Sequence, residues 1–269
     1  MRRNVVYRYD GTFEGLLCCV FESVARKEMP ANVVTLEDEQ MQLMPVKEIA
    51  TDAVKAARVF RSIPKKMSPA ALSFVEHAFL TCLPNKEVLL LDFFHQGYRY
   101  GAQVLNRLTD DTVHALVEGV KHLDHEAHLF TGFVRFSVIQ GVLVSKIAPK
   151  NVVLPLMKPH FIDRYPNEAF LIHDAVHGMA LVYRPYQSAI IPMDDFVMAE
   201  PDEEERTYRR LWKLFYDTIA VEGRENPRCR MTHMPKRYWD YLTEFQEVAS
   251  CKLQVASSEK RKTGSQWRG

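Results

Sequence analysis

A short segment near the C-terminus, Gly223 to Tyr241, concentrates positive charge that the chain as a whole does not have. The 269 residues include 35 Lys and Arg and 34 Asp and Glu, so the formal net charge is only +1. The segment reads GRENPRCRMTHMPKRYWDY, and its only carboxylates are those of Glu225 and Asp240. Any affinity of this protein for a polyanion must therefore come from such a patch, because the overall composition supplies no basic coat.

The position of Lys236 and Arg237 favours phosphate as the anion. Both follow Pro235, which predicts the start of a last helix, where the helix dipole disfavours cations by roughly several tenths of a kcal/mol. A bound phosphate reverses that argument, because the unpaired N–H groups at a helix start attract anions. Trp239 and Tyr241 add aromatic faces on which the bases of single-stranded or distorted nucleic acid stack.

These residues together form the predicted nucleic-acid-binding surface. Its members are five cations and two aromatic residues: Arg224, Arg228, Arg230, Lys236, Arg237, Trp239 and Tyr241. In the alternative reading, the arginines pair with Glu222, Glu225 and other carboxylates, and Trp239 packs beneath a sheet. The surface is slightly favoured over this alternative.

The segment HLDHEAH has the residue types of a metal site but not the spacing of a known one. His122, His125 and Glu126 lie on one face of a predicted helix. A zinc motif of the form H-E-x-x-H needs a histidine where this chain has Leu129. We therefore expect a polar helix face and no metal.

The segment IHDAVHGMAL brings His173, Asp174 and His177 together in a predicted hairpin turn. Such a turn could hold a general base or a metal, but Asp and Gly are also ordinary turn formers. We expect no metal there and assign no catalytic residue. The chain has no P-loop, no G-x-G-x-x-G and no G-x-S-x-G, and the sequence predicts no cofactor.

Composition predicts a soluble, cytoplasmic protein. Hydrophobic residues make up 47% of the chain, enough for a sizeable core, and no stretch approaches the length of a membrane span. The five cysteines are odd in number and include no C-x-x-C pair, which fits a reducing compartment. Cys18 and Cys19 stand in apolar surroundings and are assigned to the core.

The pattern along the chain predicts an α+β fold with a helical middle region, a small antiparallel sheet and C-terminal helices. A strand, an Asp10-Gly11 turn and a helix from Thr12 come first, and residues 29–50 hold one weak strand between loops. Helices are expected to begin near Asp52 and Ser68, and the helical pattern breaks at residues 84–85 and 109–111.

A hairpin around Gln140-Gly141 opens the sheet, and the strands AFLIHD and MALVYR continue it. Between them, residues 151–166 contain Pro155 and Pro159 and are expected to form short helical turns. A helix from PDEEE carries an apolar stripe and a cationic stripe beside it. The apolar stripe is Tyr208, Leu211, Trp212, Phe215 and Ile219, and the cationic stripe is Arg206, Arg209, Arg210 and Lys213. The predicted last helix has four residues that are expected to point inward: Tyr238, Leu242, Phe245 and Ala249.

Two parts are expected along the chain: a single α+β domain over residues 1–250 and a disordered basic tail over residues 251–269. The tail includes SSEKRKTGSQWRG, which has no core-forming pattern.

Four long segments in order resemble a bacterial family of DNA-metabolism or DNA-repair proteins, a domain of unknown function. They are YRYDGTFEGLLCCVFES, GFVRFSVIQGVLVSKIAPKNVVLPLMKPHFIDRYP, LIHDAVHGMALVY and LWKLFYDTIAVEGRENPRCRMTHMPKRYWDYL, within residues 4–245. In that family the domain occurs alone, encoded beside a DNA-modification radical SAM protein, or fused to a domain similar to uracil-DNA glycosylases. This chain lacks the C-x-x-x-C-x-x-C cysteines of a radical SAM protein.

The resemblance implies a DNA-repair context without supplying a mechanism. The first hypothesis is an accessory protein that binds DNA through the C-terminal surface and works with a radical SAM partner. No membrane is expected among its partners. The alternative is a hydrolase or lyase acting on DNA, with the His173, Asp174 and His177 turn as its centre. A protein-only scaffold is the third.

Overall fold

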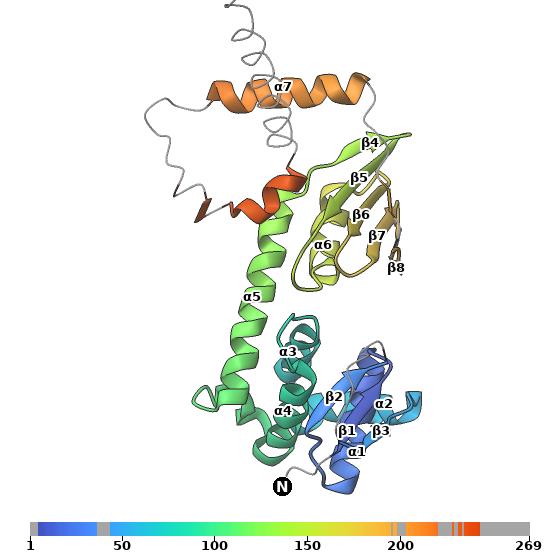
Figure 1. Ribbon diagram of the computed structural model, residues 1–269, viewed down its shortest axis with the longest axis vertical. Helices are drawn as coiled ribbons and strands as arrows, with labels where there is room; N and C mark the ends of the chain where they lie inside the picture. The colour runs from blue at the N-terminus through green and yellow to red at the C-terminus, as the bar shows by residue number, and fades with distance from the viewer. Residues whose placement is uncertain are drawn as a thin grey trace, which may run out of the picture. The chain divides into compact units, whose positions relative to one another are not determined.

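The computed structural model describes residues 5–36, 44–194, 196–197, 203–219, 228, 231–232 and 234–242, with the backbone alone at 204, 216, 217 and 219 (Figure 1). Helices and small sheets alternate along these residues, which confirms the α+β prediction. The chain divides into two compact units: residues 1–126 with 150–153, and residues 127–149 with 154–269. The predicted single domain over residues 1–250 stays a prediction, because compact units also occur inside single domains. The predicted tail, 251–269, lies outside the described residues.

The first unit combines a three-stranded parallel sheet with a group of helices. Its elements are β1 (Val6–Tyr9), α1 (Phe13–Arg26), β2 (Asn32–Thr35), β3 (Val46–Glu48), α2 (Ala53–Lys66), α3 (Pro69–Phe79), α4 (Lys86–Tyr100), the short 3-10 helix η1 (Gly101–Asn106) and most of α5 (Asp111–Phe133). The strand order is β2-β1-β3, and both outer strands pair with β1 in parallel.

Three of the predicted helix starts are confirmed by their caps. The Thr12 hydroxyl accepts a hydrogen bond from the Gly15 amide at 3.0 Å, so α1 begins where its sequence signal stands. Asp52 caps α2 and Ser68 caps α3 in the same way. The expectation of one weak strand in residues 29–50 is wrong, because the short, exposed β3 has no apolar pattern and is held by its backbone pairing with β1.

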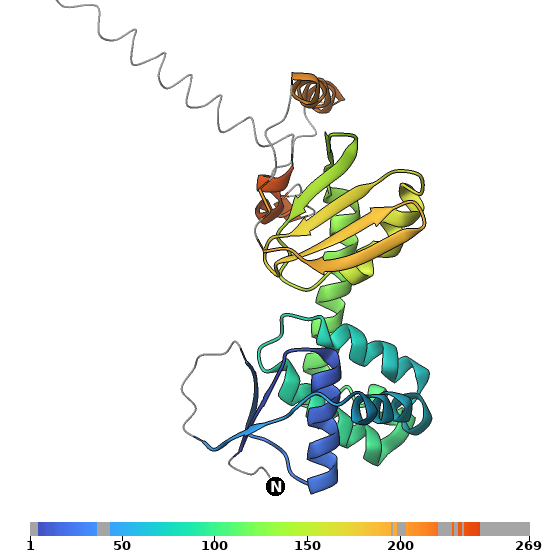
Figure 2. The ribbon, with the colours of Figure 1, turned by 90° about the vertical axis from the view of Figure 1, so that its right-hand side faces the viewer.

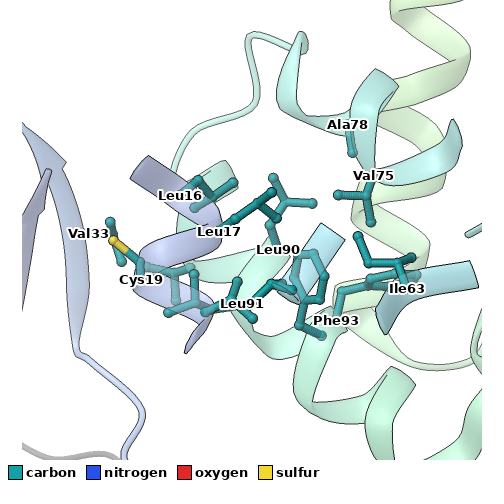
Figure 3. Packing of buried hydrophobic residues seen from close by; sticks show 14 of the residues in the cluster. Leu16, Leu17, Cys19, Val33, Ile63, Val75, Ala78, Leu90, Leu91 and Phe93 are labelled. Carbon is teal, nitrogen blue, oxygen red and sulfur yellow. The ribbon is translucent and has the colours of Figure 1, made fainter. Parts of the chain in front are cut away.

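A continuous apolar core fills the first unit. Figure 3 shows side chains from α1, α2, α3 and α4 meeting in one cluster. Fully buried members include Leu16, Ile63, Val75, Leu90 and Phe93. Cys18 and Cys19 belong to this core, as predicted, and burial raises the pKa of the Cys19 thiol.

The second unit is built on a five-stranded sheet. Its elements are the end of α5, β4 (Ser137–Ile139), β5 (Val142–Ile147), α6 (Leu154–Arg164), β6 (Phe170–Asp174), β7 (Met179–Arg184), β8 (Gln187–Pro192), α7 (Glu203–Ile219) and the 3-10 helix η2 (Lys236–Tyr241). The order β4-β5-β6-β7-β8 is antiparallel except for the β5–β6 pair, which is parallel. The predicted hairpin at Gln140-Gly141 is confirmed, since both residues have positive φ, at 50° and 79°.

One helix, α6, forms the connection between the parallel strands β5 and β6 and covers one face of the sheet (Figures 1 and 2). The expectation of separate short turns here is wrong. Pro155 lies in the first turn, where a missing N–H costs little, and Pro159 is accommodated inside the helix. Leu154, Met157 and Phe161 are buried on one side of α6, and this burial stabilises the helix in spite of the second proline.

The predicted last helix is not the structure that follows Pro235. The chain forms η2, a 3-10 helix of six residues, with Tyr238 and Leu242 buried as expected. Phe245 and Ala249 lie outside the described residues. Among the described residues, no helix combines the length and the apolar character needed to cross a membrane.

Candidate nucleic-acid interface

The structure describes part of the surface predicted from the sequence. Arg224 and Arg230 lie outside the described residues; Arg228, Lys236 and Arg237 are exposed, and Trp239 and Tyr241 are partly buried. The expected helix start at these cations is a six-residue 3-10 helix, and phosphate binding at this surface stays a prediction.

The side chains of η2 are fixed by aromatic contacts. The Tyr238 ring packs against Phe130 and Phe133 of α5, with ring centroids 5.0 and 5.2 Å apart. The Arg237 guanidinium lies 4.6 Å from the centre of the Tyr238 ring and donates to its hydroxyl. The Lys236 ammonium lies 5.9 Å from the Trp239 ring. Two cations are therefore held beside aromatic rings on the surface of the second unit.

A larger cationic and aromatic surface lies in the same unit, and the sequence pattern identified its α7 residues as stripes of one helix but not as a site. A groove of about 860 Å³ runs between α7, the end of α5 and the end of α6. Its lining residues are Gly132, Val134, Arg135, Phe136, Arg164, Tyr165, Glu205, Tyr208, Arg209, Leu211, Trp212 and Phe215. We call it the α7 groove. Three arginines, one glutamate and five aromatic rings line it.

The arginines of the α7 groove come from three separate segments of the chain. On α7, Arg209 donates to the Glu205 carboxylate at 2.9 Å and to the Ser137 hydroxyl at 2.6 Å. After α5, the Arg135 guanidinium lies 5.9 Å from the Trp212 ring and donates to the Gly132 carbonyl oxygen at 2.9 Å.

The third arginine, Arg164 at the end of α6, is exposed, and its guanidinium lies 5.8 Å from the Tyr165 ring. No sequence pattern groups these three residues, because they are far apart in the chain.

The apolar stripe of α7 faces this groove and is not part of the core. Tyr208, Leu211, Trp212 and Phe215 are 61%, 56%, 41% and 53% exposed, so the predicted apolar stripe lies on the surface. The helical spacing was correct, but periodicity shows only that apolar residues share a face and not what covers it. The side chain of Ile219 lies outside the described residues. The exposed rings are the part of the site that bases can stack on.

The His173, Asp174 and His177 turn has a defined hydrogen-bond geometry. Asp174 is fully buried and accepts from the Val176 and His177 amides at 3.0 and 3.2 Å. Its other oxygen lies 2.7 Å from His177 Nδ1, which donates to the carboxylate. This arrangement directs Nε2 of a partly exposed imidazole away from Asp174.

His173 has a different environment from His177. It is buried in β6, with Nε2 2.9 Å from the Met193 carbonyl oxygen and its ring 5.0 Å from that of Phe196. Among the described residues, no group of three or more His, Cys, Asp or Glu side chains is placed to hold a metal ion. That the turn holds no metal stays a prediction.

Glu126 of the HLDHEAH segment is a buried structural residue. Its carboxylate accepts from the Lys150 amide at 3.1 Å, the Asn151 amide at 2.9 Å and the Asn151 side chain at 2.6 Å. His122 and His125 are exposed, so they form a polar face as expected. The burial of Glu126 was not predicted, because its partners follow it by more than 20 residues.

Fold and site together define an α+β protein whose second unit carries a groove lined by arginines and exposed aromatic rings. The chain belongs to the family described as Domain of unknown function (DUF4130), whose model matches residues 84–244. The match includes every residue of the α7 groove, the turn at 173–177 and the whole of the predicted C-terminal surface. Comparison with curated proteins and with solved structures finds no match.

Proposed function

We propose that the chain binds DNA, and prefers single-stranded or locally unpaired DNA, through the α7 groove and the adjoining η2 residues. The observation that carries this proposal is the lining of the groove, which combines Arg135, Arg164 and Arg209 with the exposed rings of Tyr208 and Trp212. Cations attract the phosphates, and the rings supply stacking of about 1–3 kcal/mol per base.

The shape of the groove favours unstacked bases over an intact duplex. It is an open hollow of about 860 Å³ with exposed rings along α7. Bases inside a duplex are already stacked and do not reach rings in a hollow, whereas unpaired bases do. The η2 cations Lys236 and Arg237 extend the positive surface, since η2 packs on the last turns of α5, which also contribute Gly132 to the groove.

The biological role in this proposal is that of a DNA-repair accessory protein. It holds DNA for a partner enzyme, with a radical SAM protein that modifies DNA as the partner. This part of the proposal rests on the family resemblance of the four long segments, together with the DNA-binding chemistry of the α7 groove.

Replacing Trp212 by alanine tests the site. Leu214 is the matched control, because it lies on the same helix, is 63% exposed and does not line the groove. The assay is fluorescence anisotropy with a labelled single-stranded oligonucleotide and with the same sequence as a duplex. We expect Trp212→Ala to weaken single-strand binding by about tenfold and duplex binding less, and Leu214→Ala to change neither.

Three results would contradict the proposal. The first is that the wild-type chain does not bind the oligonucleotide. The second is that Trp212→Ala and Leu214→Ala have equal effects. The third is that Trp212→Ala weakens duplex binding as much as single-strand binding. Circular dichroism at the assay temperature confirms that both variants are folded.

The catalytic alternative, a DNA hydrolase or lyase, rests on the 2.7 Å contact between Asp174 and His177. A buried carboxylate that orients an imidazole is the arrangement used to prepare a general base. Conversion of labelled single-stranded or abasic DNA by the wild-type chain, lost in His177→Ala and kept in His160→Ala, would support it. His160 is an exposed histidine on α6 and serves as the control. If the wild-type chain converts neither DNA substrate, the catalytic alternative is contradicted.

A further inference from the structure

Helix α2 in the first unit has a strongly cationic surface that the DNA-binding proposal does not use. Its 14 residues include five cations and no carboxylate: Lys55, Arg58, Arg61, Lys65 and Lys66. Within the described part of the chain, the one of these with an ion pair is Lys55, at 3.8 Å from Asp52. Four positive charges on one helix thus have no carboxylate partner among the described residues.

A groove runs beside this cationic surface. It has a volume of about 440 Å³ and lies where α1, α2 and α4 meet. Val20 and Val24 of α1 and Val59 of α2 form an aliphatic floor, while Arg58 and Lys66 stand along the α2 side. Val24 is 39% exposed although its neighbours on α1 belong to the core. We call this the α2 groove.

The length of the α2 groove matches one face of a helix. Its lining on α2 includes Arg58, Ser62 and Lys66, which are four residues apart and therefore span about 12 Å of helix. An amphipathic helix that docks by its i, i+3 or i+4, and i+7 side chains covers about 10.5 Å. A hollow between two packed helices is also the place where a third helix fits its side-chain ridge.

The chemistry of the lining favours a protein over nucleic acid at this site. The floor is aliphatic, and two aromatic rings line the α2 groove where five line the α7 groove. Cations of Lys55 and Arg58 lie 5.8 Å from the Phe21 ring, and the Tyr98 hydroxyl is 2.8 Å from that of Ser62. Stacking of bases needs an accessible aromatic face, whereas aliphatic side chains need only an apolar floor.

We propose that the α2 groove binds an amphipathic helix of a partner protein that carries carboxylates along the edge of its apolar face. Apolar side chains of the partner enter between α1 and α2, and its carboxylates meet Arg58 and Lys66. This interaction is independent of the α7 groove, because every residue of the α2 groove belongs to the first unit.

The test uses a panel of labelled peptides of about 20 residues, long enough to form helices. Members of the acidic set carry Leu, Ile or Phe at i, i+4 and i+7 with Glu at the flanking positions. A second set replaces each Glu by Lys, and a third keeps the acidic composition in scrambled order. Binding is measured by fluorescence anisotropy to the whole chain.

The chain offers matched charge reversals on one helix. Arg58 lines the groove and Arg61 does not, and both are exposed cations of α2. We expect saturable binding of acidic amphipathic peptides and a loss of about tenfold or more in Arg58→Glu. We also expect a similar loss in Val24→Glu, which places a carboxylate on the floor, and a change below about threefold in Arg61→Glu. Thermal unfolding shows that each variant is folded.

Several outcomes would overturn the inference. They are the absence of saturable binding across the acidic set, equal affinity for the scrambled or lysine set, or equal effects of Arg58→Glu and Arg61→Glu. Binding of an oligonucleotide that Arg58→Glu abolishes would assign the groove to nucleic acid instead. Because Trp212→Ala leaves the α2 groove intact, failure of DNA binding at the α7 groove and failure of peptide binding here are separate results.

Discussion

Replacing the buried Glu126 by alanine tests how firmly one carboxylate fixes the loop between β5 and α6. Glu126 is 3% exposed and accepts three hydrogen bonds from Lys150 and Asn151 at 2.6–3.1 Å. Asn151 in turn accepts a hydrogen bond from the Cys82 amide at 2.8 Å. The carboxylate therefore joins α5 to two loops of the first unit.

The expected loss of stability in Glu126→Ala follows from the hydrogen-bond donors that the substitution leaves without an acceptor. A hydrogen bond to a charged group contributes about 1.5–3 kcal/mol, and the two bonds to Asn151 are buried. The bond from the Lys150 amide is only partly buried, so water can replace part of it. We expect Glu126→Ala to lower the free energy of unfolding by about 3–5 kcal/mol. Glu126→Gln keeps one acceptor oxygen and should lose about 1–3 kcal/mol.

The assay is urea unfolding followed by circular dichroism, where the midpoint should fall while the slope m stays unchanged. Glu118→Ala is the control, because Glu118 lies on the same helix and pairs with Lys121 on the exposed side. Its midpoint should not move measurably. A loss below about 1 kcal/mol in Glu126→Ala would refute the reasoning, since it would mean that water satisfies all three donors.

Three further predictions concern titration, the C-terminal tail and the 173–177 turn. Burial lowers the pKa of His95, whose Nε2 lies 2.7 Å from the Ser23 hydroxyl. The unfolded chain therefore binds the proton more tightly, and stability is lost as the pH falls below about 6.5. The drop in melting temperature between about pH 7.5 and pH 5.5 should be smaller in His95→Gln; an equal drop assigns the loss to carboxylates. Deleting the residues after Ser257 should leave the melting temperature unchanged, because the tail has no apolar periodicity, and a large fall would show that it packs on the fold. Purified protein should contain no stoichiometric metal at the turn; tightly bound metal that His177→Ala removes would contradict this.

The sequence predicted elements whose signals are local. Thr12, Asp52 and Ser68 were recognised as helix starts because a cap is a contact between residues two or three apart. The turn at Gln140-Gly141 was recognised because β-branched and aromatic residues alternate on both sides of it and a glycine tolerates left-handed backbone angles. Such features are fixed by neighbours in the chain and need no knowledge of the rest of the fold.

The features that were missed depend on contacts between distant residues. Nothing in the three residues of β3 indicates that they pair with β1 about 40 positions earlier. The α7 groove needs Arg135, Arg164 and Arg209 from three separate segments, so no single window of sequence contains it. The apolar stripe of α7 was found by its period, but the same period describes a buried face and an exposed one. The cationic segment 223–241 was found by composition, and its described part places Lys236 and Arg237 on the surface.

A salt titration of single-stranded DNA binding tests the proposed DNA-binding surface most directly. The protein variants are wild type, the double variant Arg164→Ala with Lys236→Ala, and the control Arg184→Ala, which changes an exposed arginine at the β7–β8 turn. If Arg164 and Lys236 each neutralise one phosphate, the double variant binds more weakly across sequences. Its log–log salt slope should then be smaller than that of the wild type by about 1.4, at about 0.7 per single-strand contact. The control should keep the wild-type slope. Equal affinities and slopes for the double variant and the wild type, with both proteins folded, would contradict the proposal that this surface binds DNA.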